Sequence, residues 1–155
     1  SEGAAPSHHR FALLAGGRCP RCATRLRAGR LRQECSGCGC VTFDTRGEVD
    51  AFLSHLAGRL PLTALVCAGF GAIPLLGIVP GVLYYRLTLV GGARRYLPAT
   101  TGCTTRWLVR ALNLLLLSLQ WIPFVGAATL PLLCVTNFGV YARALRAEAT
   151  HSLPP

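Results

Sequence analysis

Two Cys-x-x-Cys pairs near the N-terminus are the residues of this chain whose type and spacing could do chemistry. Cys19 and Cys22 form the first pair, and Cys35 and Cys38 form the second after a spacer of twelve residues. Two thiolates three positions apart can hold one side of a metal ion, and a second pair can complete a tetrahedron. The spacing therefore predicts a four-thiolate metal site.

Zinc is the metal that this ligand set favours. Zn²⁺ is held by four thiolates in many structural sites, and iron bound by similar cysteine pairs is the alternative. Cys40 could replace Cys38 as a ligand, but Cys38 keeps the regular spacing, so we expect Cys40 to be a strand residue that faces the core. A shell of four thiolates has no open position, which indicates a structural metal and not a catalytic one.

The chain around these cysteines has the pattern of a small β domain. Residues 24–27 and 30–33 alternate in polarity with a glycine between them, which predicts a hairpin. Residues 40–43 predict a third strand. A domain of this size buries too little apolar surface to fold without help, so we expect the metal to supply its folding free energy.

Residues 17–45 resemble the zinc-ribbon family. The resemblance lies in the pairs Cys-Pro-Arg-Cys and Cys-Ser-Gly-Cys and in Gly39, which follows the second pair as a glycine often does in ribbons. It implies a β ribbon whose zinc ion is bound by the four paired cysteines: Cys19, Cys22, Cys35 and Cys38.

The charges of the chain are unevenly distributed. The chain is 52% hydrophobic and only 14% charged, with a formal net charge of +10, whereas a soluble domain is usually about 25% charged. All sixteen basic residues are arginine, and no Asp or Glu occurs between residues 51 and 147. This balance favours an anionic neighbour: lipid headgroups, nucleic acid or an acidic protein surface.

Two long apolar segments, residues 61–90 and 107–142, have the composition of membrane helices. A helix needs about 20 residues to cross a bilayer core of roughly 30 Å, so each segment is too long for one crossing and short for two. The pattern Ile-Pro-x-x-Gly occurs near the middle of both, at residues 73–77 and 122–126. A soluble helix bundle is the alternative, but residues 112–119 offer little polar outer face.

Arginines precede, separate and follow the two apolar segments, and the positive-inside rule assigns all three flanks to the cytoplasm. A hairpin in each segment keeps the flanks on one side, whether it spans the membrane or only re-enters it. The predicted fold class is therefore a small β zinc ribbon plus an all-α membrane region of two tandem Pro/Gly-broken helical hairpins.

The predicted organisation has seven parts. These are a flexible tail (1–17), the zinc ribbon (18–47), an amphipathic linker helix (48–60), the first membrane hairpin (61–90), a basic cytoplasmic loop (91–106), the second membrane hairpin (107–142) and a tail (143–155). Aromatic residues are expected at the headgroup level: Tyr84, Tyr85, Tyr96, Trp107 and Tyr141. Polar side chains are expected to hydrogen-bond between helices: Asn113, Ser118, Gln120, Thr136 and Asn137.

Catalysis finds little support in the sequence, because residues 61–142 contain no carboxylate and no histidine that could act as a general base. We therefore expect no enzyme, but a bacterial inner-membrane protein with its ribbon and both termini on the cytoplasmic side. The ribbon would be a binding or scaffolding module at the membrane face, in contact with anionic headgroups and with a protein partner.

Two other functions remain open. The order of ribbon and helices is similar to the family of paraquat-inducible protein A, which implies a subunit of a lipid-handling or membrane transport complex. The other is a membrane-tethered regulator that binds nucleic acid. It is less favoured because Phe11 and Phe43 are the only aromatic residues near the arginine run of residues 18–32, so no stacking surface is evident.

Overall fold

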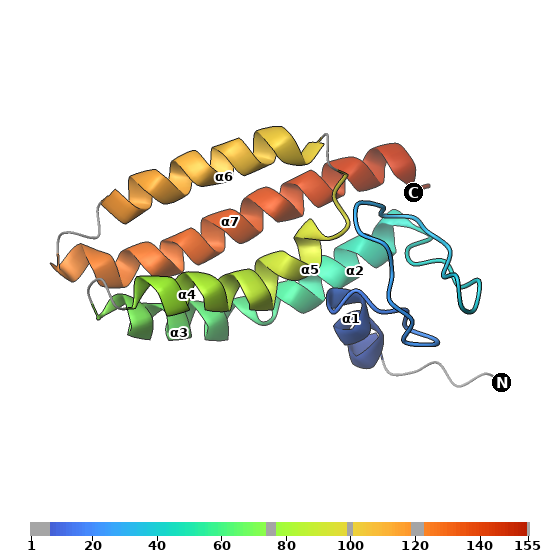
Figure 1. Cartoon of the computed structure of the whole chain (residues 1–155), viewed down its shortest axis with the longest axis horizontal. Helices are drawn as coiled ribbons and strands as arrows, with labels where there is room; N and C mark the ends of the chain where they lie inside the picture. The colour runs from blue at the N-terminus through green and yellow to red at the C-terminus, as the bar shows by residue number, and fades with distance from the viewer. Residues whose placement is uncertain (1–6, 74–76, 99–100, 119–122, 155) are drawn as a thin grey trace.

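The computed structural model is an elongated bundle of helices with a helix-free, cysteine-rich segment at one end (Figure 1). It describes residues 7–73, 77–98, 101–118 and 123–154. The helices are α1 (Ser7–Ala15), α2 (Arg46–Ala57), α3 (Leu60–Gly71), α4 (Ile78–Tyr85), the π-helical turn η1 (Arg86–Val90), α5 (Gly91–Arg94), α6 (Thr101–Ser118) and α7 (Pro123–Ser152). Residues 16–45, between α1 and α2, are called the cysteine module below.

Helix α7 is the centre of the bundle. It packs against α3 along much of its length and also contacts α2, α4 and α6 (Figure 1). Leu130, Leu133 and Cys134 are fully buried on this helix. Helices α2 and α3 follow one another with only Gly58 and Arg59 between them, and Pro61 lies in the first turn of α3, where its missing N–H costs no helix bond.

The prediction of a small β domain is wrong. The described residues contain no β-strand, and only two isolated antiparallel bridges occur, between Arg18 and Arg25 and between Glu34 and Val41. The side chain of Gln33 explains why the expected hairpin does not form a ladder. Its amide accepts a hydrogen bond from the backbone N–H of Arg27 and donates to the carbonyl of the same residue, at 3.1 and 2.9 Å. The backbone N–H and carbonyl of Arg27 therefore bond a side chain and not a neighbouring strand.

The predicted fold class, a β ribbon plus two tandem Pro/Gly-broken hairpins, is therefore replaced by a helical chain with a strandless cysteine module. Of the two Ile-Pro-x-x-Gly segments, residues 74–76 and 122 lie outside the described part of the chain. Helix α7 already begins at Pro123, so the second segment is largely part of a helix.

Both predicted tails contribute to the folded structure. Residues 7–15 form α1, whose Leu14 is fully buried, and residues 143–152 continue α7 and bury Leu145 and Ala149. The segment predicted to be a basic loop, residues 91–106, contains α5 and the start of α6, and its Tyr96 and Leu97 are buried. Sequence periodicity did not reveal these elements because their apolar partners lie on distant segments.

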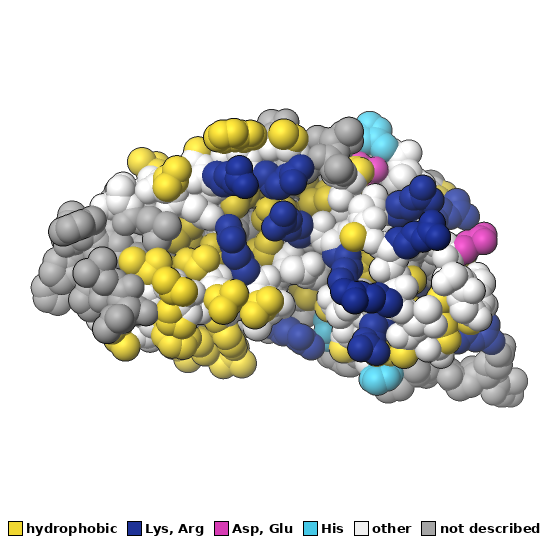
Figure 2. Space-filling model, in the orientation of Figure 1, with side chains coloured by type: hydrophobic (Ala, Val, Ile, Leu, Met, Phe, Trp, Pro, Cys, Tyr) yellow, Lys and Arg dark blue, Asp and Glu magenta, His cyan; other side chains and the backbone are white. Residues whose placement is uncertain are grey.

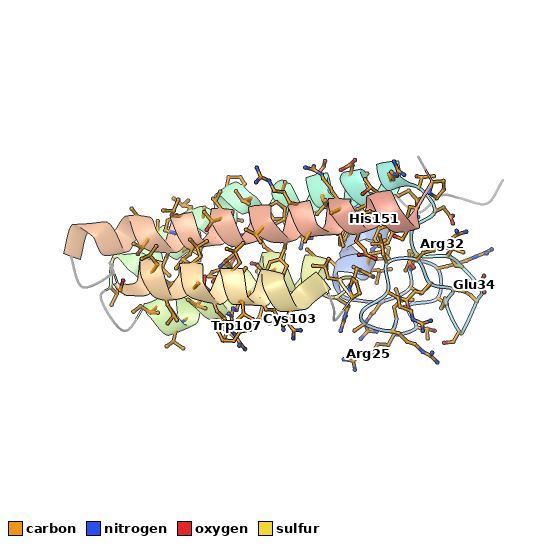
Figure 3. All side chains as sticks on the ribbon, turned by 90° about the horizontal axis from the view of Figure 1, so that it is seen from above. Arg25, Arg32, Glu34, Cys103, Trp107 and His151 are labelled. Carbon is orange, nitrogen blue, oxygen red and sulfur yellow. The ribbon has the colours of Figure 1, made fainter. Side chains whose placement is uncertain are left out.

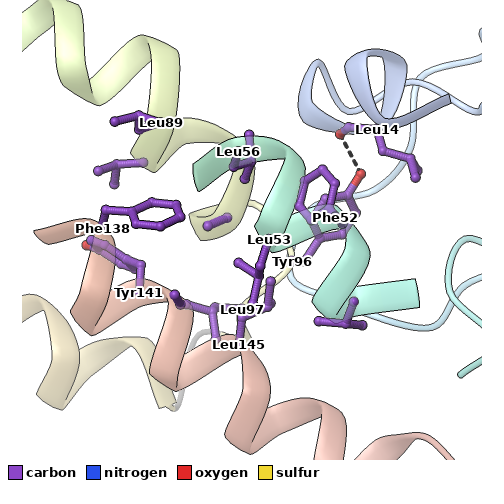
Figure 4. Close-up of a cluster of buried hydrophobic side chains, with 14 of the residues drawn as sticks. Leu14, Phe52, Leu53, Leu56, Leu89, Tyr96, Leu97, Phe138, Tyr141 and Leu145 are labelled. Carbon is purple, nitrogen blue, oxygen red and sulfur yellow. Dashed lines mark hydrogen bonds between the residues drawn. The ribbon is translucent and has the colours of Figure 1, made fainter. Parts of the chain in front are cut away.

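A cluster of four aromatic rings joins the cysteine module to the helices. Phe43 of the module lies edge-on to Tyr96 at a centroid distance of 5.2 Å and packs on Phe52 of α2 at 5.6 Å. Phe11 of α1 contacts Phe52 at 6.1 Å. The hydroxyl of Tyr96 donates a 2.7 Å hydrogen bond to the Leu14 carbonyl (Figure 4). These contacts join the cysteine module, α1 and α2 to the distant segment that carries Tyr96.

Polar contacts also join the helices next to the cysteine module. Arg46, at the start of α2, donates to the carbonyls of Thr150 and Leu153 and so caps the C-terminus of α7. The ion pair of Arg10 with Glu48 ties α1 to α2. The cysteine module, which lies between α1 and α2, is therefore held at the end of the bundle where α7 ends (Figure 1).

Candidate metal centre

The structure brings the four paired cysteines into one cluster. The sulfur atoms of Cys19, Cys22, Cys35 and Cys38 all lie within 4.8 Å of one another. The closest approaches join the two pairs: Cys19 to Cys38 at 3.6 Å and Cys22 to Cys35 at 3.4 Å. Both distances are far longer than the roughly 2.05 Å of a disulfide. The thiols are therefore gathered around a common centre without being bonded to each other.

The two pairs lie on turns with matching backbone hydrogen bonds. In the first turn the N–H of Cys19 donates to the carbonyl of Thr24, and the N–H of Ala23 donates to the carbonyl of Cys19. In the second turn the N–H of Cys35 donates to Cys40, and the N–H of Gly39 donates to Cys35, all at 2.9 Å. The two turns therefore carry their sulfur atoms on the same pattern of backbone hydrogen bonds.

The residue after each pair adopts a left-handed conformation. Gly39 has φ = 70°, which costs a glycine nothing, whereas Ala23 occupies the equivalent position with φ = 57°. A left-handed conformation costs a residue with a Cβ roughly 1–2 kcal/mol. The first turn is therefore strained at Ala23 and the second is not.

This difference gives a testable prediction. Ala23→Gly should raise the free energy of unfolding by about 1 kcal/mol, and Gly39→Ala should lower it by a similar amount. Chemical denaturation of the zinc-loaded chain in detergent measures both changes. Ala28→Gly, at an exposed position with an ordinary backbone, serves as the control. A loss of stability in Ala23→Gly would contradict the equivalence of the two turns.

The cluster is half enclosed, and its thiols differ in pKa. Cys19 and Cys35 are buried, Cys38 is half-buried and Cys22 is exposed. Hydrogen bonds with the side chain and backbone of Thr24, followed by one with Cys35, lower the pKa of Cys22 to about 6. A hydrogen bond with the Cys40 backbone lowers the pKa of Cys38, but burial and hydrogen bonds with the other three cysteines outweigh it and raise that pKa to about 12. A thiolate is the form that binds a metal ion. Arginines of the surrounding module add positive potential near this negative cluster.

The donor set and its spacing fit zinc. Four sulfurs at the usual Zn–S distance of about 2.3 Å form a tetrahedron whose edges measure about 3.8 Å. The two closest sulfur pairs, at 3.4 and 3.6 Å, lie near this value. Four thiolates also leave no place for a water molecule or substrate on the ion. The cluster is thus suited to hold a metal and not to perform metal catalysis.

The other cysteines lie outside the cluster. Cys40 is half-buried and bonds the carbonyl of Val41, and burial raises the pKa of its thiol. It faces the core as expected, although not from a strand. Cys67 and Cys134 are fully buried between α3 and α7, while Cys103 is exposed at the start of α6. Among the described residues only the four paired cysteines form a group of metal-ligand type.

A basic groove of about 510 Å³ lies on the cysteine module. Its lining is rich in arginine and contains no aromatic ring: Arg25, Leu26, Arg27, Arg30, Arg32, Gln33, Glu34, Ser36 and Val41. Figure 3 shows Arg25, Arg32 and Glu34 at the end of the molecule formed by the module. The run of arginines in the sequence indicated a basic surface here, but the groove depends on the turns that fold around Gln33.

The opposite part of the molecule exposes apolar side chains instead (Figure 2). This apolar surface consists of Leu62, Leu65, Ile73, Val79, Leu83, Leu87, Trp107, Leu108, Leu114, Leu115, Leu132 and Val135. Two helical segments, Arg46–Gly71 and Ala128–Ser152, are long and apolar enough to cross a membrane. In their most apolar stretches, 28% of the first segment and 50% of the second are buried, whereas a core helix of a soluble protein is mostly buried.

The five aromatic residues expected at the headgroup level differ in exposure. Tyr85, Tyr96 and Tyr141 are buried in the bundle, whereas Trp107 is 65% exposed on α6 and contacts Arg110 by a cation–π interaction. Tyr84 is half-buried. Only Trp107 has the exposure that an interfacial anchor needs, because the three buried tyrosines fill space between helices.

The polar side chains expected to link helices do so at one place. Asn137 of α7 donates hydrogen bonds to Tyr85 of α4 and to Asn113 of α6, at 2.9 and 3.0 Å. Thr136 and Ser118 bond carbonyls of their own helices instead. Gln120 lies outside the described residues. Asn137 is therefore the polar residue that connects three segments of the bundle.

Comparison with known proteins adds no relative from which a function could be transferred. No protein-family model matches the chain, and no curated protein or solved structure matches it either. Function must therefore be inferred from three features of the molecule itself: the thiol cluster, the basic groove and the apolar surface.

Proposed function

We propose that this chain is an integral membrane protein whose zinc-bound cysteine module acts as a binding or scaffolding module at the cytoplasmic face of a bacterial inner membrane. One observation carries the proposal: the thiol cluster and its arginines lie at one end of the bundle, and the apolar surface lies toward the other (Figures 1 and 2). We infer no enzymatic activity, since a closed thiolate shell supports structure and not turnover.

Zinc in this proposal supplies folding free energy. The cysteine module has only a few buried apolar side chains of its own, among them Leu26, Leu31 and Phe43. So small a core does not hold some thirty residues without strands. Cys19, Cys22, Cys35 and Cys38 would hold the ion, and the rigid turns would then keep the basic groove in shape.

The basic groove supports an acidic protein segment as the partner. Arg25, Arg27, Arg30 and Arg32 are all exposed around it, and Glu34 is the one acidic residue in its lining. It lies at the end away from most of the apolar surface, which favours a partner in the aqueous phase over lipid headgroups (Figure 3). The lack of an aromatic ring in its lining makes nucleic acid the less favoured ligand.

The groove can be tested with a fluorescent oligo-glutamate peptide and the zinc-loaded full chain in a neutral detergent. We expect a variant with glutamine at residues 25, 27, 30 and 32 to bind the peptide about tenfold or more weakly, because opposite charges across an interface guide association. Arg59 and Arg143, both exposed outside the groove, provide the control when replaced by glutamine.

An equal loss in that control would show that net charge and not the groove binds the peptide. A single-stranded oligonucleotide that binds more tightly than the peptide, and only when the groove is intact, would instead favour the nucleic-acid regulator.

Orientation in the membrane gives a separate prediction. In a Cys103→Ser background, Ser152→Cys should stay unlabelled by an impermeant thiol reagent in intact cells and become labelled after lysis, because arginine-rich flanks stay in the cytoplasm. Ile73→Cys, 51% exposed at the far end of α3, tests whether that end reaches the outside. Labelling of Ser152→Cys in intact cells would overturn the cytoplasmic assignment.

A further inference from the structure

A small cavity lies between the helices, far from the thiol cluster in the sequence. It has a volume of about 60 Å³, well above the roughly 10–15 Å³ that one water needs. Three segments supply its lining: Tyr85, Arg86, Val90, Gly91, Arg94, Val109, Asn137 and Tyr141. The residues toward the surface, Arg86, Gly91 and Arg94, are exposed, whereas Tyr85 and Asn137 are buried. The cavity thus has a basic mouth and a polar floor.

The floor contains a buried acceptor without a partner. Asn137 is only 1% exposed, and both hydrogen bonds of its side chain, to Tyr85 and Asn113, are donated by Nδ2. Its Oδ1 is buried and accepts no hydrogen bond. A buried polar atom left unpaired destabilises the folded protein. The floor therefore calls for a ligand group that donates a hydrogen bond.

The mouth carries positive charge that the chain does not neutralise. Arg86 and Arg94 form no ion pair with any described residue, and the sequence has no carboxylate between residues 51 and 147. Guanidinium groups recognise phosphate by charge-assisted, often bidentate hydrogen bonds. The mouth therefore calls for an anion of phosphate type.

The π turn η1 helps to direct both arginines to the same cavity. Arg94 lies eight positions after Arg86, and in a regular α-helix this spacing would turn the second side chain about 80° past two full turns. The wider turn of η1, in which the Gly91 N–H donates to the carbonyl of Arg86, reduces that offset. Both arginines accordingly line one cavity although they lie on different turns.

The cavity lies where the apolar surface ends. Among the described residues, the last exposed large apolar side chain on η1 is Leu87, next to Arg86, and on α7 it is Val135, two positions before Asn137. On α6 the lining residue Val109 lies near the start of the exposed apolar run, which begins at Trp107. If the apolar surface lies in a bilayer, the cavity is at the level of the phospholipid headgroups.

We propose that this cavity binds a phosphate ester that carries a hydroxyl group. The phosphate lies between Arg86 and Arg94, and the hydroxyl donates a hydrogen bond to Oδ1 of Asn137. The proposal rests on the proposed membrane location for the source of the ligand, which is then an anionic phospholipid with a polyol headgroup. A free phosphate ester of the same chemistry is the other source.

The test uses the zinc-loaded full chain in a neutral detergent, with binding followed by native mass spectrometry and thermal shift. The probes are phosphatidylglycerol, phosphatidylcholine and free glycerol 3-phosphate. We expect one tightly bound phosphatidylglycerol per chain, and phosphatidylcholine to bind about tenfold or more weakly because it has no headgroup hydroxyl for Asn137. Binding of glycerol 3-phosphate as well would identify a free ester as a ligand of the same site.

Three variants connect the binding to the cavity. Arg86→Gln with Arg94→Gln, both at exposed positions, should weaken binding of phosphatidylglycerol about tenfold or more. Asn137→Asp keeps the side-chain shape and places a carboxylate in the cavity lining, so it should exclude the phosphate. Because it also removes the hydrogen bonds donated to Tyr85 and Asn113, helix content and zinc content are measured on the same sample to confirm that the chain is folded. Arg143→Gln, exposed on α7 outside the cavity, is the matched control and should change the affinity less than about twofold.

Two results would overturn the proposal: no selective binding of phosphatidylglycerol or glycerol 3-phosphate, or equal binding by the double arginine variant. The cavity would then hold only water. Zinc content and membrane extraction are measured on the same samples, so a chain that keeps its zinc and its membrane association but binds no phosphate ester refutes this site without refuting the proposed function.

Discussion

Cys35→Ser should remove the metal from the chain and unfold the cysteine module. Cys35 is buried, and its sulfur lies 3.4 Å from that of Cys22. Its replacement by serine therefore removes a buried sulfur ligand from the four-thiolate metal site. Structural zinc contributes about 10–16 kcal/mol to the folding of small domains, and most of this is expected to be lost. The measurement is zinc per chain together with the rate of trypsin cleavage between residues 18 and 32, where six exposed arginines lie on backbone that should become cleavable when the module loosens.

Two serine variants define the outcome. Cys103→Ser, at an exposed position outside the cluster, should keep about one zinc per chain and full trypsin resistance. Cys40→Ser should also keep the metal, because Cys40 bonds a backbone carbonyl and is not one of the four clustered thiols. If Cys40→Ser loses the zinc while Cys38→Ser keeps it, the ligand set is wrong. Normal folding of Cys35→Ser without metal would refute the structural role of zinc.

Arginine on the apolar surface should prevent stable insertion into the membrane. Leu65 on α3 and Leu114 on α6 are 70% and 71% exposed. An arginine at the centre of a membrane helix costs about 2.5–3.5 kcal/mol, whereas a change on a water-exposed surface usually alters stability by less than about 0.5 kcal/mol. The double variant Leu65→Arg, Leu114→Arg should therefore fail to remain in membranes during alkaline carbonate extraction.

The matched control places the same charges at the other end of the bundle. Ala51 on α2 and Ala147 on α7 are exposed, and arginine at both should leave the extracted fraction unchanged. A Leu65→Arg, Leu114→Arg chain that stays in the membrane, or a wild-type chain that is freely soluble without detergent, would contradict membrane insertion.

The four metal-type cysteines could be predicted because their geometry is local. A spacing of three residues on a turn fixes where two sulfur atoms point, and the same backbone hydrogen bonds recur around Cys19 and Cys35. The metal cluster thus follows from short-range sequence. The strands predicted beside it do not occur, because the Gln33 side chain bonds both backbone groups of Arg27. The alternation of polar and apolar residues in the sequence does not indicate such a bond.

Features that depend on distant partners were not predictable in the same way. Helix α1 is a short segment with no partner nearby in the sequence, yet its Leu14 is fully buried, and the Leu14 carbonyl accepts a hydrogen bond from Tyr96, which lies 82 positions later. Tyr141 has the sequence context of an interfacial aromatic residue, but α7 turns it into the core (Figure 4). The unpaired Oδ1 of Asn137 is visible only once three helical segments are placed together.

The most direct test of the account is zinc X-ray absorption on the full chain purified from membranes in a neutral detergent without added metal. We predict one zinc per chain with four sulfur neighbours at about 2.3 Å and no oxygen or nitrogen ligand. The cysteine module would then be a closed thiolate clamp that orders a basic surface beside the apolar part of the molecule. Absence of bound metal, or a zinc ion with fewer than four sulfur ligands, would contradict it.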